Sequence, residues 1–203
     1  MVNTNSQRLT SDERRASIIA SATTEFARGG YGGARTAAIA RDARINETLL
    51  FRHFGSKQGL YLACIDHVWS LVRQRCATSF AAEPDPAQHW RLPGRVFLEL
   101  SRNEPELAGL WARALSDSTG ISKIDEQLAG VMREIHAFAV DVITRSQLAG
   151  GVLDGRNPRA EAWLVIAIGL LATVGQRLGE VVLDDLDDVL AAHRTWLTGT
   201  PDP

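Results

Sequence analysis

The stretch that most constrains the fold of this chain is residues 39–57, with the sequence IARDARINETLLFRHFGSK. Ile39, Ala40 and Ala43 have the i, i+1, i+4 spacing of one helix face. The pattern then stops and restarts within three residues. The apolar positions of the second helix, which is too short to stand alone, are Leu49, Leu50, Phe51 and Phe54.

The residues between the two patterns predict how they are joined. Asn46 is a plausible N-cap for the second helix, because its side-chain oxygen can accept from orphan amides of the first turn. Ile45 is placed to fill the crossing of the two helices. The stretch therefore predicts a helix-turn-helix whose second helix enters a groove of DNA.

Charge is divided unevenly along the chain. Residues 1–60 carry nine Lys or Arg against five acids, net +4, whereas the remainder has thirteen against nineteen, net -6. A positive segment on an acidic body suits phosphate contact through one face, although +4 alone is weak evidence.

Length and composition indicate a folded, cytoplasmic protein. With 203 residues and 45% hydrophobic residues, the chain can form one compact unit or a small domain joined to a larger one. The longest uncharged apolar run, residues 162–174, is too short to span a bilayer, and the first ten residues do not resemble a signal peptide. We expect no membrane association.

The two cysteines, Cys64 and Cys76, fall in one predicted helix. Twelve residues at about 1.5 Å of rise place them about 18 Å apart, beyond disulfide reach. We expect small buried core residues, with a redox sensor as the alternative.

The N-terminal third predicts three helices. Thr10 and Glu13 form a capping box for a first helix that ends at Gly29-Gly30. A short helix from about residue 35 or 36 to 43 leads into the second helix of the motif, about 46–53, and Gly55 closes it. We expect a helix-turn-helix DNA-binding domain over residues 1–56, and an effector-binding and dimerisation domain over residues 57–203.

The rest of the chain predicts a helical bundle. A helix runs from Ser56 toward Phe80, and residues 82–94, which hold three prolines, indicate a loop. Helices are expected over about 95–102, from Pro105 to a break at 116–120, and over about 124–150. The last of these has a narrow apolar seam that must pack on other helices: Ile124, Leu128, Val131, Ile135, Phe138 and Val142.

The last two helices, near 158–178 and 184–198, predict a dimer interface. Asn157-Pro158 opens the first, and residues 162–174 are apolar around nearly the whole helix, so cover is needed on every side. A second copy of the chain would supply part of it. The alternative is that both helices complete a monomeric core.

Residues 14–61 resemble the tetracycline-repressor (TetR) family of bacterial transcription regulators. The matching features are a helix-1 phenylalanine before glycine and tyrosine, Ile-Ala eight residues after that tyrosine, His-Phe, and Gly-Ser-Lys with a leucine soon after. The resemblance implies an all-α homodimer with an N-terminal helix-turn-helix domain joined by a connecting helix to a C-terminal ligand-binding and dimerisation bundle. Most relatives repress palindromic operators, and a small effector changes the separation of their two reading heads.

Several residues are candidates for DNA contact. Thr36 can meet a phosphate or merely cap its helix, and Arg35 can neutralise a phosphate. The leading turn of the second helix can read base edges, and its end faces the backbone. The expected set is Arg35, Thr36, Arg44, Asn46, Glu47, Thr48, Phe51, Arg52, His53 and Lys57.

The chain departs from the family pattern at three of these positions. Arg44 stands where relatives usually have glycine, which adds a cation or disfavours a left-handed turn. Phe51 replaces a tyrosine that often donates to phosphate, and Leu49 replaces a small or hydroxylated residue. We expect the backbone contacts to depend more on Arg44, Arg52, His53 and Lys57.

The resemblance alone implies an effector pocket in the C-terminal bundle. Its composition favours a largely apolar effector held by few polar groups. The candidate lining residues are Trp69, Phe97, Trp111, His136, Phe138 and Trp163.

Other function classes have little support. No zinc-binding cysteine pair, phosphate-binding glycine loop or nucleophile-elbow serine motif is present, and the five histidines are scattered, so we expect no enzyme, metal site or cofactor. The alternative to a one-component repressor is a ligand-sensing protein of the same fold that has lost sequence-specific DNA binding. The identity of the effector, the operator sequence and the sign of regulation do not follow from the sequence.

Overall fold

The computed structural model describes residues 10–116, 121–178 and 186–200, and these residues form helices without any strand. The helices are α1 (Ser11–Gly33), α2 (Thr36–Asp42), α3 (Glu47–Phe54), α4 (Lys57–Ala82), η1 (Pro86–Arg91, a 3-10 helix), α5 (Leu92–Asn103), α6 (Pro105–Ser116), α7 (Ser122–Leu148), α8 (Pro158–Leu178) and α9 (Leu186–Thr198). The predicted all-helical class is confirmed. The proposed break at 116–120 and the first residues of the 184–198 helix fall largely outside the described residues.

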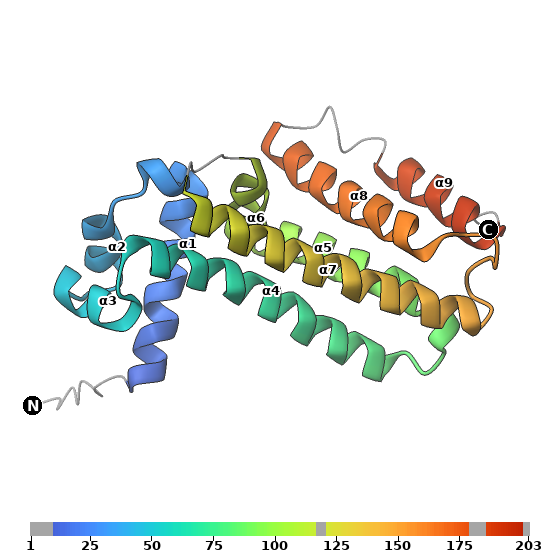
Figure 1. The fold of residues 1–203 in the computed structure, drawn as a ribbon, viewed down its shortest axis with the longest axis horizontal. Helices are drawn as coiled ribbons and strands as arrows, with labels where there is room; N and C mark the ends of the chain where they lie inside the picture. Colours follow the sequence, from blue (N-terminus) through green and yellow to red (C-terminus); the bar gives the residue numbers. More distant parts are fainter. Residues whose placement is uncertain (1–9, 117–120, 179–185, 201–203) are drawn as a thin grey trace, which may run out of the picture.

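Helices α1 to α3 lie at one end of an elongated molecule, and α4 and α7 run side by side along its length (Figure 1). The predicted capping box opens α1: the Thr10 hydroxyl accepts from the Glu13 amide at 3.2 Å, and the Glu13 carboxylate accepts from the Thr10 amide at 2.8 Å. Gly30, at φ 64°, interrupts the helical geometry of α1 where the double glycine predicts an end.

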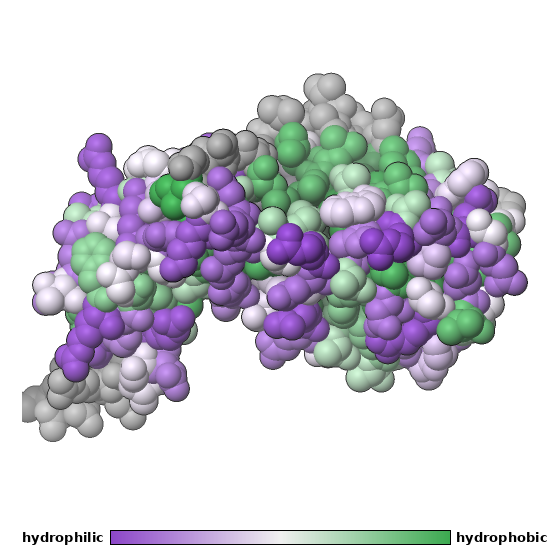
Figure 2. Space-filling view, in the orientation of Figure 1, coloured by the Kyte–Doolittle hydropathy of each residue, from purple (hydrophilic) through white to green (hydrophobic). Residues whose placement is uncertain are grey.

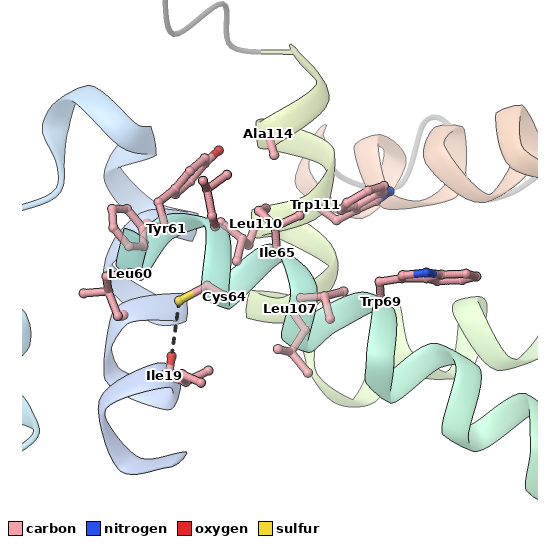
Figure 3. Packing of buried hydrophobic residues seen from close by; sticks show 14 of the residues in the cluster. Ile19, Leu60, Tyr61, Cys64, Ile65, Trp69, Leu107, Leu110, Trp111 and Ala114 are labelled. Atoms are coloured by element: carbon pink, nitrogen blue, oxygen red, sulfur yellow. Dashed lines mark hydrogen bonds between the residues drawn. The ribbon is translucent and has the colours of Figure 1, made fainter. Parts of the chain in front are cut away.

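The core joins the two ends of the molecule. Side chains of α4 insert between α1 and α6 (Figure 3), and the Cys64 thiol donates to the Ile19 carbonyl at an S–O distance of 3.9 Å. One cluster of buried residues extends from Ile18 in α1 to Val131 in α7. The proposed domain boundary after residue 56 stays a prediction, and the hydrophobic core passes across it.

The prediction of a loop over residues 82–94 is wrong in its middle and end. Pro86 lies in the first turn of η1, where the Asp85 carboxylate accepts from the Ala87 amide at 3.0 Å, and Pro93 lies in the first turn of α5. Proline lacks an amide hydrogen that a first turn does not use, so these prolines begin helices.

Burial raises the pKa of both the Cys64 and the Cys76 thiol to about 12. At pH 8 about one thiol in ten thousand would then be ionised, and the thiolate is the nucleophile. We expect both cysteines to react with a disulfide reagent at least a hundredfold more slowly in the native protein than in guanidinium. Rapid labelling of either thiol in the native protein, followed by absorbance, would revive the redox alternative.

Gly151 supports a close approach of η1 to the end of α7. A Cβ at this position would lie 1.8 Å from the Ala87 carbonyl oxygen. We expect Gly151→Ala to lower the free energy of unfolding by about 2 kcal/mol, because backbone must move to relieve the overlap. Gly155→Ala, whose Cβ meets nothing within 4 Å, is the control and should stay within about 0.5 kcal/mol of the parent in urea unfolding.

Candidate nucleic-acid interface and internal cavity

Helix α3 is fixed through one face and exposed on the other. Leu50 is its fully buried residue, packed with the half-buried Ile45 and Phe54 in the core cluster. From α1, the guanidinium of Arg15 lies 4.4 Å from the centre of the Phe54 ring, and its Nη1 lies 3.5 Å from the His53 carbonyl oxygen. These contacts set the orientation of α3, and Arg15 is a positioning residue that the sequence patterns did not reveal.

The turn between α2 and α3 is closed in spite of its unusual residue. The Ile45 amide donates to the Ala40 carbonyl at 2.9 Å, and the Arg44 amide donates to the Arg41 carbonyl at 3.1 Å. This pairing ends a helix with a left-handed residue that is commonly glycine. Arg44 adopts that conformation, with φ 55°, so the turn keeps its form and its side chain is exposed.

The outer face of α3 carries the predicted base-reading residues. Glu47, Thr48 and Arg52 are exposed, and Phe51 is 37% exposed. The Asn46 side chain accepts from the Leu49 amide at 2.8 Å, so it caps the helix as predicted, and it remains exposed. The structure therefore brings the leading turn and Arg52 to one accessible surface.

Arg14 of α1 lies next to this surface. It lines the same hollow, about 720 Å³ in volume, as Arg44 and Asn46. The sequence patterns did not predict a role for Arg14, because it lies on α1, outside the stretch from Arg35 to Lys57 that carries the predicted contacts. Its position beside Asn46 follows from the crossing of α1 with the two shorter helices.

The first residues of α2 and α4 lie at the same end of the molecule as α3 (Figure 1). Thr36 is the first residue of α2, and Arg35 occupies the N-cap position without a side-chain capping bond, so capping by Thr36 is excluded. Lys57 begins α4, with Nζ 3.5 Å from the Gly32 carbonyl oxygen and 5.0 Å from the centre of the Tyr31 ring. A helix start with a nearby ammonium is suited to bind phosphate.

His53, in the last turn of α3, is half-buried, with its ring centre 6.3 Å from that of Phe54.

A small cavity of about 80 Å³ lies inside the C-terminal bundle. Trp69, Phe97, Trp111 and Phe138, four of the six expected lining residues, surround it, together with residues of α8. His136 and Trp163 do not line it. Their rings stack on each other at 4.4 Å, and the His136 Nε2 lies 2.9 Å from the Arg159 carbonyl oxygen. Helical spacing predicted that His136 and Trp163 pack against other helices. It did not predict that the two rings would stack on each other instead of lining the cavity.

Helices α8 and α9 leave apolar side chains uncovered. Figure 2 shows hydrophobic side chains gathered over α8. Trp163 and Leu171 are each 49% exposed. Among the described side chains of the two helices, the exposed large apolar ones are Trp163, Leu164, Leu171, Val174, Val189 and Trp196. We call this set the apolar stripe. The uncharged run 162–174 is too short to span a bilayer, but the longer segment Pro158–Gly175 around it is long and apolar enough by length and composition alone. Core helices of soluble proteins pass the same test.

A buried carboxylate links the ends of α8 and α9. Glu161 lies 3.2 Å from His193 Nε2 and accepts from the Trp196 indole at 3.0 Å. The Leu153 amide donates to the Leu197 carbonyl at 3.1 Å. These bonds hold the C-terminal half of α9 against the bundle. In the described part of the chain, no three His, Cys, Asp or Glu side chains are grouped as metal ligands would be.

Comparison with known proteins matches the N-terminal part of the chain to a family of regulators. Residues 18–64 match the family model described as bacterial regulatory proteins, tetR family. The regulatory protein RaaS of Mycobacterium tuberculosis is 30% identical over 155 residues, 76% of this chain and 66% of RaaS. The activator FasR of Mycolicibacterium smegmatis is 37% identical over 51% of this chain, and the repressor NicS of Pseudomonas putida 28% over 61%. The matches span 48% of FasR and 62% of NicS.

Solved structures share the fold along most of the chain. FadR of Bacillus subtilis in complex with stearoyl-CoA has a TM-score of 0.74 at 13% identity, covering 91% of this chain and 98% of FadR. AibR in complex with isovaleryl coenzyme A and operator DNA has a TM-score of 0.70 at 16% identity, covering 92% and 98%. The helix-turn-helix sequence and the all-helical architecture agree, and this chain belongs to the tetR family of bacterial transcriptional regulators.

Proposed function

We propose that this protein is a homodimeric repressor that binds palindromic DNA through α3 and is released by a small, largely apolar effector bound in the C-terminal bundle. The observation that carries the proposal is the exposed face of α3, whose orientation is set by buried Leu50 and by Arg15 stacked on Phe54. A helix fixed on one side and polar on the other is what major-groove reading requires.

The chemistry of that face suggests how it would read DNA. Arg52 can pair with guanine, Glu47 can accept from cytosine, and Lys57, at the start of α4, can hold a phosphate. Arg44 adds a cation at the turn. The absence of a hydroxyl at Phe51 leaves these cations to supply the backbone contacts.

The apolar stripe supports a dimer. Six large apolar side chains exposed on α8 and α9 exceed what scattered surface residues need, and a second copy related by a twofold axis would cover each stripe with its equivalent. Dimerisation would also place two α3 helices for half-sites about 34–36 Å apart.

Helix α4 offers a route from effector to DNA. Its first residue is Lys57, and Trp69 and Val72, which line the internal cavity, lie three to four turns further along the same helix. A ligand that displaces these side chains would tilt α4 and move Lys57 with the α3 it packs against. NicS is a repressor and FasR an activator, so repression is the part of the proposal that binding data must decide.

The alternative, a ligand sensor without sequence-specific DNA binding, is favoured by one observation, the exposed anion Glu47 on the reading face. Selection of duplexes from a randomised pool separates the two. Enrichment of a palindrome with half-sites one helical turn apart supports the regulator, whereas retention of all sequences alike, abolished by salt, supports the alternative.

The cations near α3 generate a prediction about salt. We expect the double variant Arg52→Ala, Lys57→Ala to bind the selected operator at least tenfold more weakly, with the slope of log K against log salt reduced by about 0.9 for each phosphate that the variant no longer neutralises. Arg133→Ala, which removes an exposed arginine of α7, is the control. Unchanged affinity and slope in the double variant, measured by mobility shift, would refute the assignment.

The apolar stripe generates a prediction about assembly. We expect Leu171→Glu to raise the dimer dissociation constant at least a hundredfold, because two carboxylates would be buried across the twofold axis without partners. Leu148→Glu changes an 84% exposed leucine at the end of α7 and should leave the dimer intact. Sedimentation velocity measures both, and a parent protein that is monomeric at micromolar concentration would overturn the proposed interface.

A further inference from the structure

A second, larger hollow lies beside the internal cavity. It has a volume of about 570 Å³ and is lined by residues of η1, α5, α8 and α9. The residues of α9 that line it, including Leu190 and Arg194, differ from those of the apolar stripe, Val189 and Trp196. None of the six residues of the apolar stripe lines the hollow. We call it the outer groove.

The outer groove is cationic. Arg91, Arg95 and Arg102, spaced by four and seven residues, line it from η1 and α5, and Arg194 lines it from α9. Its carboxylates are Glu99 and Asp187. This excess of positive charge stands in the part of the chain, residues 61–203, whose net charge is -6. Arginines concentrated in one hollow of an otherwise acidic domain favour an anionic ligand.

Ion pairs engage two of the four lining arginines, Arg91 and Arg95. Arg95 lies 3.6 Å from Glu99, but both side chains are more than half exposed, so the pair is weak and can be exchanged for a ligand. Arg91 lies 3.2 Å from Glu83. Among the described residues, Arg102 makes no ion pair. Arg95 and Arg102 can therefore be reoriented toward a ligand at little cost.

A thin wall separates the outer groove from the internal cavity. Gly94, Val165 and Gly169 line both spaces. A Cβ on Gly94 would lie 3.8 Å from Val165, and one on Gly169 would lie 3.1 Å from the Phe97 ring, so Val165 and Phe97 pack against the two glycines. Rotation of Val165 and Phe97 would join the two spaces.

The sizes of the two spaces suggest that they act together. The cavity of about 80 Å³ is below the range of about 300 to 1,000 Å³ that is typical of ligand pockets, whereas the groove of about 570 Å³ lies within it. The joined space has an arginine-lined mouth and an apolar, aromatic end. Such a shape is complementary to a molecule with a charged head and a hydrocarbon tail.

We propose that the effector is an anionic amphiphile, with its head on Arg91, Arg95, Arg102 and Arg194 and its acyl chain directed past Gly94 and Gly169 toward Phe97 and Trp111. The inference rests on the proposed function, since it names the chemical class of the effector. A carboxylate or the phosphates of a thioester carrier would satisfy the arginines alike, through charge-assisted hydrogen bonds.

Calorimetric titration of the full chain with three probes tests the head group. The probes are dodecanoate, dodecanoyl-CoA and the neutral dodecanol, each below its micellar concentration. Binding of either anion at least tenfold more tightly than dodecanol supports the proposal, and the comparison of the two anions identifies the head as carboxylate or phosphate. Equal binding of all three, or binding of none, overturns it.

Variants test the location. We expect Arg95→Gln with Arg102→Gln, both exposed and outside the core, to weaken binding of the anion at least tenfold and to leave dodecanol unchanged. Arg133→Gln is the matched control. Gly94→Leu, which fills the wall, should weaken the anion at least tenfold even though the arginines remain. Full anion affinity in the double arginine variant would refute the site.

The failure of this inference can be told from failure of the proposed function. Sequence-specific operator binding by a protein that binds neither anion would leave the regulator intact and remove the amphiphile. Anion binding by a protein without operator preference would support the amphiphile and refute the proposed sequence-specific regulator. If both hold, adding the tighter anion should release the operator in the parent and not in the double arginine variant.

Discussion

The burial of one face of α4 between α1 and α6 is the interaction on which the rest of the structure depends. Cys64 and Tyr61 are fully buried there, and the Phe26, Tyr31 and Tyr61 rings pack edge to face or stacked. One cluster of buried hydrophobic residues extends from α1 to α7. Because this core is continuous, the helix-turn-helix cannot change its position without repacking α6 or α4.

That coupling gives a physical basis for regulation. A close-packed core transmits displacement, since most of its side chains have little free volume into which to relax. Helix α4 carries both Lys57 and two residues that line the internal cavity, Trp69 and Val72. The proposed effector and the proposed operator would therefore contact the same helix. The outer groove extends this arrangement to α5 and α9, which a bound anion would draw together.

Charge is divided between the two ends of the molecule. Arg14, Arg15 and Arg44 lie beside α3 and Arg52 lies on it, where phosphates would lie. The acidic C-terminal part carries its local cationic excess in the outer groove. Two separate cationic surfaces on a chain of net charge -2 are consistent with two different anionic partners. The exposed apolar stripe on α8 and α9 shares no residue with either surface, so DNA, effector and partner copy need not compete.

The sequence determined the elements that depend on local rules: the capping box at Thr10, the cap at Asn46, the prolines that open α6 and α8, and the short helix pair that indicates the family. These rest on contacts between residues a few positions apart. The tertiary structure decided what lies between distant segments. It placed four expected aromatic residues around a cavity and turned His136 and Trp163 away, fixed α3 through Arg15, and gathered arginines from η1, α5 and α9 into one groove. Helical periodicity reports that a face is buried but not which helix covers it, because that choice is made by packing among elements far apart in the chain.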